Sequence, residues 1–148
     1  MLRGGYTGCQ NGLGIRVYNS TTTPKTVTID HATVTKYNKN GITVSGPVAA
    51  TITNNTVTGG GPLGLGFAAQ NGIQVSYGAS AKLVGNTVTL NNYTPPKVTA
   101  CGLLLYKAGG VSGATKSGIS YVKADNTITN NETDICNFGK GGGFSPAP

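Results

Sequence analysis

The string Asn-Gly-Ile-Thr-Val at residues 40–44 recurs as Asn-Gly-Ile-Gln-Val at residues 71–75, 31 residues later. Each copy precedes a second string, Asn-Thr-Val-Thr, at residues 55–58 and 86–89. Related copies of the two strings lie on either side, at residues 14–17, 32–35, 102–105 and 126–129. Four copies at a spacing of about 30 residues predict a repeat architecture.

Apolar and polar residues alternate within each copy, as at Ile42, Thr43 and Val44. A period of two is typical of a strand with one buried face, and no stretch shows the i, i+3, i+4, i+7 spacing of an amphipathic helix. Glycine and asparagine separate the alternating stretches, as expected for turns with positive φ. We therefore expect an all-β chain with little or no helix.

A repeat of short strands buries its apolar face only by stacking on its neighbours. In a parallel β-helix each repeat forms one coil, and equivalent residues of adjacent coils lie about 4.8 Å apart. Equivalent residues then form columns, two of which point inward: Ile15, Ile42, Ile73 and Leu103, and Val34, Val57, Val88 and Ile128. At one turn we expect a ladder of hydrogen-bonded amides that stops before Ala32, formed by Asn55, Asn86 and Asn126.

These features resemble the right-handed parallel β-helix repeat proteins, the pectate-lyase-like solenoid superfamily. The resemblance depends on the two repeated strings and the asparagine column, and it covers about residues 12–138. It implies a right-handed solenoid, and the repeats of this chain provide about four to five coils. The group carries lyases, hydrolases, epimerases, adhesins and tailspikes on one scaffold, so the resemblance implies no single activity.

At 148 residues the chain is expected to form a single domain. The expected coils cover about residues 12–37, 38–68, 69–99 and 100–131, with a partial fifth coil at 132–138 and a tail at 139–148. The long interval between the two strings of coil four predicts an insertion at residues 107–117 and an additional strand at 118–121.

Two long loops, residues 59–69 and 91–100, are expected at the same corner of adjacent coils, where they should touch. Loops on a rigid scaffold commonly carry binding residues. The candidate binding residues on them are Leu63, Leu65, Phe67, Tyr93, Pro95 and Lys97. In the alternative interpretation, the three apolar side chains of the first loop pack back onto the solenoid wall.

The formal charge is +7, from 11 Lys and Arg against 4 Asp and Glu, and the lysines are spread along the chain. This charge favours acidic polysaccharides or other anionic surfaces as partners, without specific nucleic-acid binding. The simpler alternative is that outward lysines keep exposed β-structure soluble. No cofactor, metal ligand pattern or membrane-spanning run is evident in the sequence.

The three cysteines leave their pairing open. Cys9 and Cys101 are expected in coils one and four, about 14 Å apart at the spacing between strands, which exceeds disulfide reach. Cys101 and Cys136 lie on adjacent coils but about three residues apart along the strand, so a bridge requires the last coil to bend. Buried thiols, or a bridge between subunits, are the alternatives.

Enzymes of the resembling group use clustered carboxylates: aspartates that bind calcium, with Arg or Lys as base, in the lyases, and two or three aspartates in the hydrolases. Here Asp30 and Asp125 fall in distant coils, beyond the ~5–9.5 Å separation of a glycosidase pair. Glu132 and Asp134 project to the same side of one strand and are the weak catalytic candidates. A carbohydrate-active enzyme is therefore the secondary hypothesis.

We expect instead an extracellular structural or binding module. It would either bind polysaccharide surfaces through the two loops or self-associate end to end into filaments, because uncapped solenoid ends are templates for strand pairing. A minor alternative is ice binding by the outward Thr-x-Thr ranks of the second string. The sequence from Met1 shows no secretory leader, and we expect that a longer precursor loses one.

Overall fold

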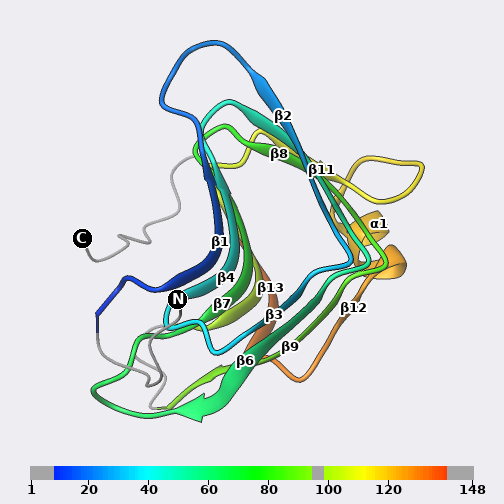
Figure 1. The fold of residues 1–148 in the computed structure, drawn as a ribbon. Helices are drawn as coiled ribbons and strands as arrows, with labels where there is room; N and C mark the ends of the chain where they lie inside the picture. The colour runs from blue at the N-terminus through cyan, green and yellow to red at the C-terminus, as the bar shows by residue number, and fades with distance from the viewer. Residues whose placement is uncertain (1–8, 95–98, 140–148) are drawn as a thin grey trace.

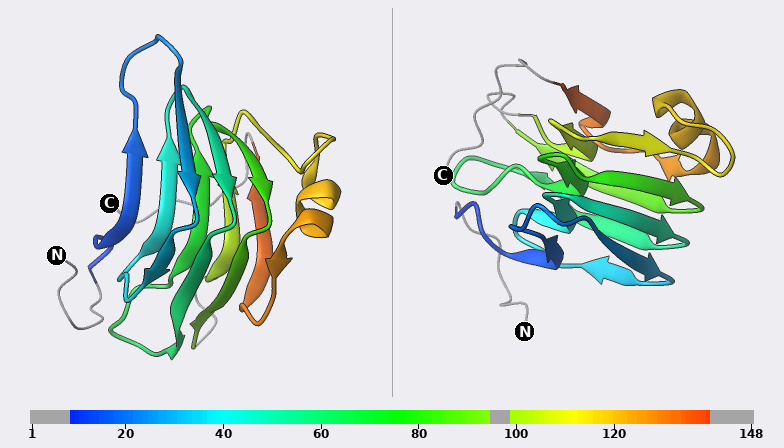
Figure 2. Two further views of the ribbon diagram at one scale, coloured as in Figure 1. Left: turned by 45° about the vertical axis from the view of Figure 1, so that its right-hand side comes forward. Right: turned by 90° about the horizontal axis from the view of Figure 1, so that it is seen from above.

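Each sequence repeat forms one coil of three short strands in a computed structural model of the protein, and the coils stack in parallel (Figure 1). The structure describes residues 9–94 and 99–139. Viewed along the stack the three sheets form the sides of a triangle, and from the side the coils lie one above another (Figure 2). The chain is thus a right-handed parallel β-solenoid, as predicted.

Three parallel sheets, here called A, B and C, make up the walls. Sheet A holds β1 (Leu13–Tyr18), β4 (Asn40–Ser45), β7 (Asn71–Ser76), β10 (Cys101–Tyr106) and β13 (Thr133–Phe138). Sheet B holds β2 (Lys25–Asp30), β5 (Val48–Thr53), β8 (Ser80–Val84) and β11 (Gly110–Ser112). Sheet C holds β3 (Thr33–Thr35), β6 (Thr56–Leu63), β9 (Thr87–Tyr93) and β12 (Thr127–Ile128).

The predicted inward columns are confirmed by the strand register. Ile42 pairs with Ile15 and Ile73, Leu103 continues the column, and Ile135 extends it into the fifth coil. The valine column pairs in the same way across sheet C and ends at Ile128. These side chains form one continuous buried core, with Ile42, Ile73 and Leu103 fully shielded from solvent.

The predicted asparagine ladder is also confirmed. The Asn55 side-chain amide donates to Asn86 Oδ1 at 2.9 Å, and that of Asn86 donates to Asn126 Oδ1 at 2.8 Å. Asn55 Oδ1 accepts the backbone N–H of Ala32, where the ladder stops one coil short of the N-terminal end. A second, unpredicted ladder joins Asn91 to Asn131 at the corner between sheets C and A. Buried turn backbone is satisfied by side-chain amides at both corners.

The predicted strand at 118–121 is wrong, because this segment begins helix α1 (Ile119–Asp125). Val122 is fully buried in the core and Ile119 packs against the core, a spacing of three residues that only a helix brings to one face. The predicted insertion at 107–117 also contains β11, which is the sheet B strand of coil four. The extra chain of this coil therefore lies mostly after β11, at the corner that α1 occupies (Figure 1).

A column of glycines bends four strands of sheet A, namely β1, β4, β7 and β10. Gly41 and Ile42 both face the interior, since a Cβ added at Gly41 would lie 2.4 Å from Val57 Cγ1, while Ile42 is a core residue. Two consecutive inward residues break the alternation of the strand, and sheet A curves so that its outer face is concave (Figure 1). The other members of the column are Gly14, Gly72 and Gly102.

Substitution of Gly72 tests this bend. A Cβ at Gly72 would lie 2.2 Å from Val88 Cγ1 and 2.7 Å from the Gly102 carbonyl oxygen. We expect Gly72→Ala to lower the free energy of unfolding by about 3 kcal/mol, because backbone and core must both move. The measurement is urea unfolding followed by circular dichroism.

The matched control is Gly110→Ala, also in a strand, where an added Cβ meets nothing within 4 Å. Its stability should stay within about 0.5 kcal/mol of the parent protein. Equal losses in the two variants would contradict a steric role for the glycine column.

Asn86 occupies the middle of the first ladder and is buried. Asn86→Ala removes one donor to Ile52 O and the acceptor for the Asn55 backbone N–H, and both groups are buried. We expect thermal unfolding to show a loss of about 2–4 kcal/mol, because the buried Asn55 N–H loses its acceptor and the ladder is broken in its middle. Asn92→Ala, which breaks one exposed bond to Asn130 O, is the control and should cost less than about 1 kcal/mol.

Candidate functional site

The concave outer face of sheet A forms a groove of about 910 Å³ that crosses coils one to four. Its floor consists of the outward positions of four neighbouring strands, which the register brings into columns. One column contains Arg16, Thr43, Gln74 and Leu104, and a second contains Tyr18, Ser45, Ser76 and Tyr106. The sequence therefore places a mixed polar and aromatic surface on the only sheet that the glycine column bends.

A chain of side-chain hydrogen bonds fixes the polar floor. Asn71 donates to Asn40 Oδ1 at 2.9 Å, and Asn40 donates to Gln74 Oε1 at 2.9 Å and to Thr43 Oγ1 at 3.1 Å. Gln74 in turn donates to Ser76 Oγ at 3.1 Å. The amides are thereby held in one orientation, while the hydroxyl of Thr43 and the second N–H of Gln74 still have hydrogen-bonding capacity.

Aromatic side chains border the groove on both sides. At the corner with sheet B, Tyr77 packs edge-on against Tyr106 with ring centroids 5.3 Å apart, and the Arg16 guanidinium lies 5.2 Å from the Tyr18 ring centroid. Tyr18 is 60% exposed and Tyr77 50%. At the opposite corner Phe67 and Tyr93 line the groove. Rings that are partly exposed and fixed by neighbours are suited to packing against a ligand.

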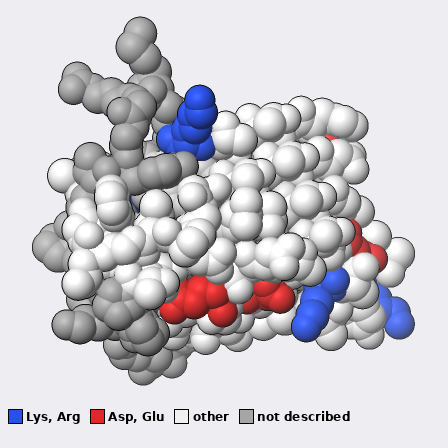
Figure 3. Space-filling view, turned by 90° about the horizontal axis from the view of Figure 1, so that it is seen from below, with Lys and Arg blue, Asp and Glu red and all other residues white. Residues whose placement is uncertain are grey.

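The charge of the groove is positive. Arg16 and Lys39 line it, whereas none of the four acidic residues of the chain does. Burial lowers the pKa of Lys39 to about 8. Seen from below, the surface is largely uncharged, with few basic and acidic side chains (Figure 3).

The six candidate binding residues have different environments. The two loops touch as predicted, since Leu63 pairs with Tyr93 and the Thr94 N–H donates to Leu63 O at 2.8 Å. Leu63 is buried, Leu65 is 69% exposed, and Phe67 is 40% exposed. Of the three apolar side chains of the first loop, only Leu63 is buried. Phe67 and Tyr93 belong to the groove, and Pro95 and Lys97 lie outside the described residues.

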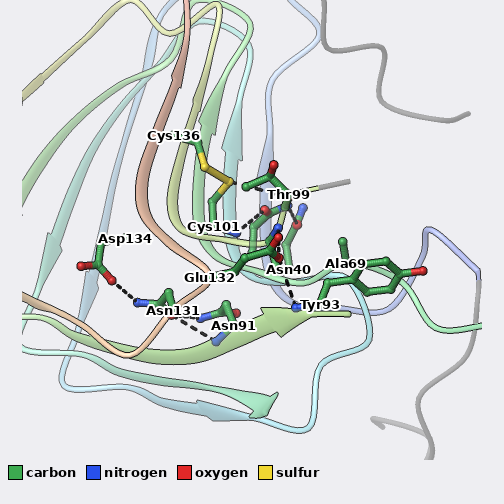
Figure 4. The surroundings of a disulfide bond; sticks show 12 residues. Asn40, Ala69, Asn91, Tyr93, Thr99, Cys101, Asn131, Glu132, Asp134 and Cys136 are labelled. Carbon is green, nitrogen blue, oxygen red and sulfur yellow. Dashed lines mark hydrogen bonds between the residues drawn. A yellow bond between two sulfur atoms is a disulfide. The ribbon is translucent and has the colours of Figure 1, made fainter. Parts of the chain in front are cut away.

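The two weak catalytic candidates do not face the groove. Glu132 Oε2 accepts the backbone N–H groups of Tyr93 at 3.2 Å and Ala100 at 3.0 Å, so it joins the two ends of the second loop. Asp134 accepts from the Asn131 side chain at 3.3 Å and points away from Glu132 (Figure 4). Both carboxylates therefore have local structural partners.

Asp30 lies at the corner between sheets B and C. Its carboxylate accepts Thr53 Oγ1 at 2.6 Å and lies 2.7 Å from the ring of His31. The hydrogen bond from Thr53, then that from His31, lower the pKa of Asp30, whose side chain is 41% exposed. This small cluster is far in sequence and in the fold from the last coil, where Glu132 and Asp134 lie.

A disulfide joins Cys101 to Cys136 on the outer face of sheet A (Figure 4). The register pairs Cys101 with Thr133 and Cys136 with Leu104, so the predicted offset of three residues is present. The bend of sheet A nevertheless brings the two Cα atoms to 5.9 Å. The bend occurs in β1, β4, β7 and β10 and not only in the last coil. The buried-thiol alternative is wrong for this pair. Cys9 is exposed and takes no part in this bridge.

The outward threonines of sheet C form the two ranks that the sequence predicts. Thr33, Thr56, Thr87 and Thr127 are paired across coils, and Thr35, Thr58 and Thr89 make the second rank. The first rank is exposed, whereas Thr58 and Thr89 are half-buried. Ice binding by this face stays a prediction.

The groove was not identified from the sequence, although its columns were visible there. The outward residues Arg16, Thr43, Gln74 and Leu104 differ in chemistry, so they give no repeated motif. The signal that could have located the groove is the glycine before each inward Ile or Leu, because it marks where the strand must bend. Sequence reasoning placed the function on the loops, which contribute only one margin.

Within the described residues, no three His, Cys, Asp or Glu side chains gather as a metal site would require, and no helix there is long and apolar enough to span a membrane. A family model described as a right-handed beta helix region matches residues 7–145. Comparisons with curated proteins and with solved structures give no match.

Proposed function

The chain belongs to the right-handed β-helix family, and we propose that it is a binding module that holds an acidic polysaccharide in the sheet A groove. The observation that carries this proposal is the combination of fixed amides, partly exposed rings and cationic side chains on one concave face. Sugars present apolar ring faces and many hydroxyl groups, which aromatic rings and oriented amides complement.

The charge of the groove selects among sugars. Arg16 and Lys39 line it without a carboxylate nearby, so a uronic acid or another anionic sugar would be attracted and a cationic one repelled. The groove also crosses several coils, and a ligand that spans two columns of rings would be an oligosaccharide rather than a monosaccharide. Extended acidic polysaccharide is the ligand that fits both properties.

Binding is favoured over cleavage of the glycan. Glycoside hydrolysis commonly depends on a pair of carboxylates about 5–9.5 Å apart that flank the scissile bond. All four acids of the chain lie outside the groove, and Glu132 and Asp134 are engaged by neighbouring backbone or amide groups. The carbohydrate-active enzyme hypothesis therefore has no acid pair on this surface.

The disulfide supports an extracellular location for this module. Disulfides persist in oxidising compartments and are rare in reducing ones. The bridge between Cys101 and Cys136 closes a loop with a sequence separation of 35, on the face that we propose binds the glycan.

Arg16→Ala and Tyr77→Ala test the site. Each should lower affinity for a uronic-acid polysaccharide by about tenfold, because one removes a cation and the other an exposed ring. Lys82→Ala removes an exposed cation from the outer face of sheet B and should change affinity by less than about twofold. Affinity is measured by calorimetry against uronic-acid chains, with neutral dextran as the reference polymer.

Two results would contradict the proposal. If Lys82→Ala weakens binding as much as Arg16→Ala does, the attraction is a general effect of net charge. If no uronic-acid polysaccharide binds better than dextran, the groove does not select acidic sugars.

End-to-end self-association is a second candidate function. It is favoured because the hydrophobic core is only partly covered at both ends of the stack. Ile15, Val17, Val27 and Ala32 of the first coil are only partly buried, as are Ala108, Val111, Ile119 and Ile135 near the last. Partly exposed core residues beside strand edges that no described residue pairs favour addition of another solenoid.

This candidate predicts filaments of constant width in negative-stain images at high protein concentration. The molar mass from light scattering should also rise with protein concentration. High salt should not dissolve them, because the contact would be apolar and backbone-mediated. A monodisperse monomer at high concentration would rule out this candidate and leave the groove proposal unaffected.

A further inference from the structure

Lys39 occupies an unusual position among the lysines of the chain. It lies between β3 and β4, just before Asn40, and its side chain lines the groove at the margin that also holds Phe67 and Tyr93. The amine Nζ donates to the Ala69 carbonyl oxygen at 2.7 Å. A backbone carbonyl of the first loop thus holds the amine at the wall of the cavity.

No acidic side chain compensates this amine. The four acids of the chain lie elsewhere, at the B–C corner, at the end of α1 and in the last coil. The other titratable groups that line the groove are Arg16 and four tyrosines, and no carboxylate is among them. Desolvation is the sole cause that lowers the pKa of Lys39 to about 8. A substantial fraction of the amine is therefore neutral near pH 7.5.

A neutral lysine amine in a cavity has a specific chemistry. Its nitrogen lone pair is available to attack a carbonyl carbon, which a protonated ammonium cannot do. Desolvation in a partly apolar site is one of the ways by which proteins activate lysine for this reaction. Phe67 and Ala69 supply apolar surface beside Lys39.

We propose that Lys39 is a covalent capture site for small aldehydes or ketones that enter the sheet A groove. The Nζ lone pair forms a bond to the carbonyl carbon, and the carbonyl oxygen takes up a proton to give a carbinolamine. Loss of water, with both amine protons leaving on the former carbonyl oxygen, forms the C=N bond of an imine. The step needs no oxidant or reductant, and water reverses it.

The other described lysines provide the comparison within one molecule. Lys25, Lys36, Lys82, Lys107, Lys116 and Lys123 are all exposed. These amines are solvated, so the desolvation that activates Lys39 does not act on them. Near neutral pH, Lys39 should therefore react faster than the six exposed lysines. The ratio of the two rates should fall as the pH rises toward 10.5.

The experiment treats the full chain with glycolaldehyde and cyanoborohydride, which reduces each imine to a stable secondary amine. Peptide mass spectrometry then gives a rate for every lysine between pH 7 and pH 10.5. At pH 7.5 we expect Lys39 to be labelled at least about tenfold faster than the mean of the six exposed lysines. Lys39→Arg should abolish this fast site, and Lys36→Arg should leave it unchanged.

Two results would overturn the proposal. One is labelling of Lys39 that is no faster than that of the exposed lysines at any pH, which would show a closed site or an ordinary amine. The other is an NMR titration of the Lys39 ε-methylene that gives a midpoint above about 10. Both are independent of polysaccharide binding, so a failure of the proposed function would leave this inference standing.

Discussion

The absence of a side chain at one position per coil determines the shape of this solenoid. At Gly41 and Gly72 an added Cβ would overlap the valine of sheet C in the same coil and the glycine carbonyl of the next coil. The chain can therefore turn inward there, and sheet A becomes concave outside. In the fifth coil Asp134 takes the equivalent place, before Ile135, and the described residues after it include no sheet C strand to oppose it. The bend is needed only where a complete coil surrounds the core.

The bend has consequences on both faces of sheet A. Inside, it lets Ile42 and its column approach the valines of sheet C and close the core. Outside, it brings side chains three positions apart close together, which makes the Cys101–Cys136 bridge and the groove possible. The two ladders, through Asn86 and Asn91, satisfy the turn backbone at the corners on either side of sheet C. A rigid wall with satisfied corners suits a site that must be formed before the ligand arrives.

Much of the fold could be predicted from the sequence because stacked coils repeat residue types at equivalent positions. The Ile and Val columns and the Asn55–Asn86–Asn126 ladder were predicted because each repeats a residue type at a constant interval. Helix α1 was missed because it occurs once, with only Ile119 and Val122 to mark its inner face. The groove was missed, and the pairing of Cys101 with Cys136 was left open, because both depend on a bend that straight strands do not have. The outward residues, such as Gln74 and Leu104, follow no repeat from which the bend could have been predicted.

The most direct test of the central claim, that the concave face of sheet A is the binding surface, is an NMR titration with a uronic-acid oligosaccharide. The account predicts chemical-shift changes at Arg16, Gln74, Tyr77 and Tyr106, along the groove, with Thr51 of sheet B and Thr87 of sheet C unaffected. Shift changes concentrated on sheet B or sheet C would contradict the account, because they would place the ligand on a face that the glycine column does not shape.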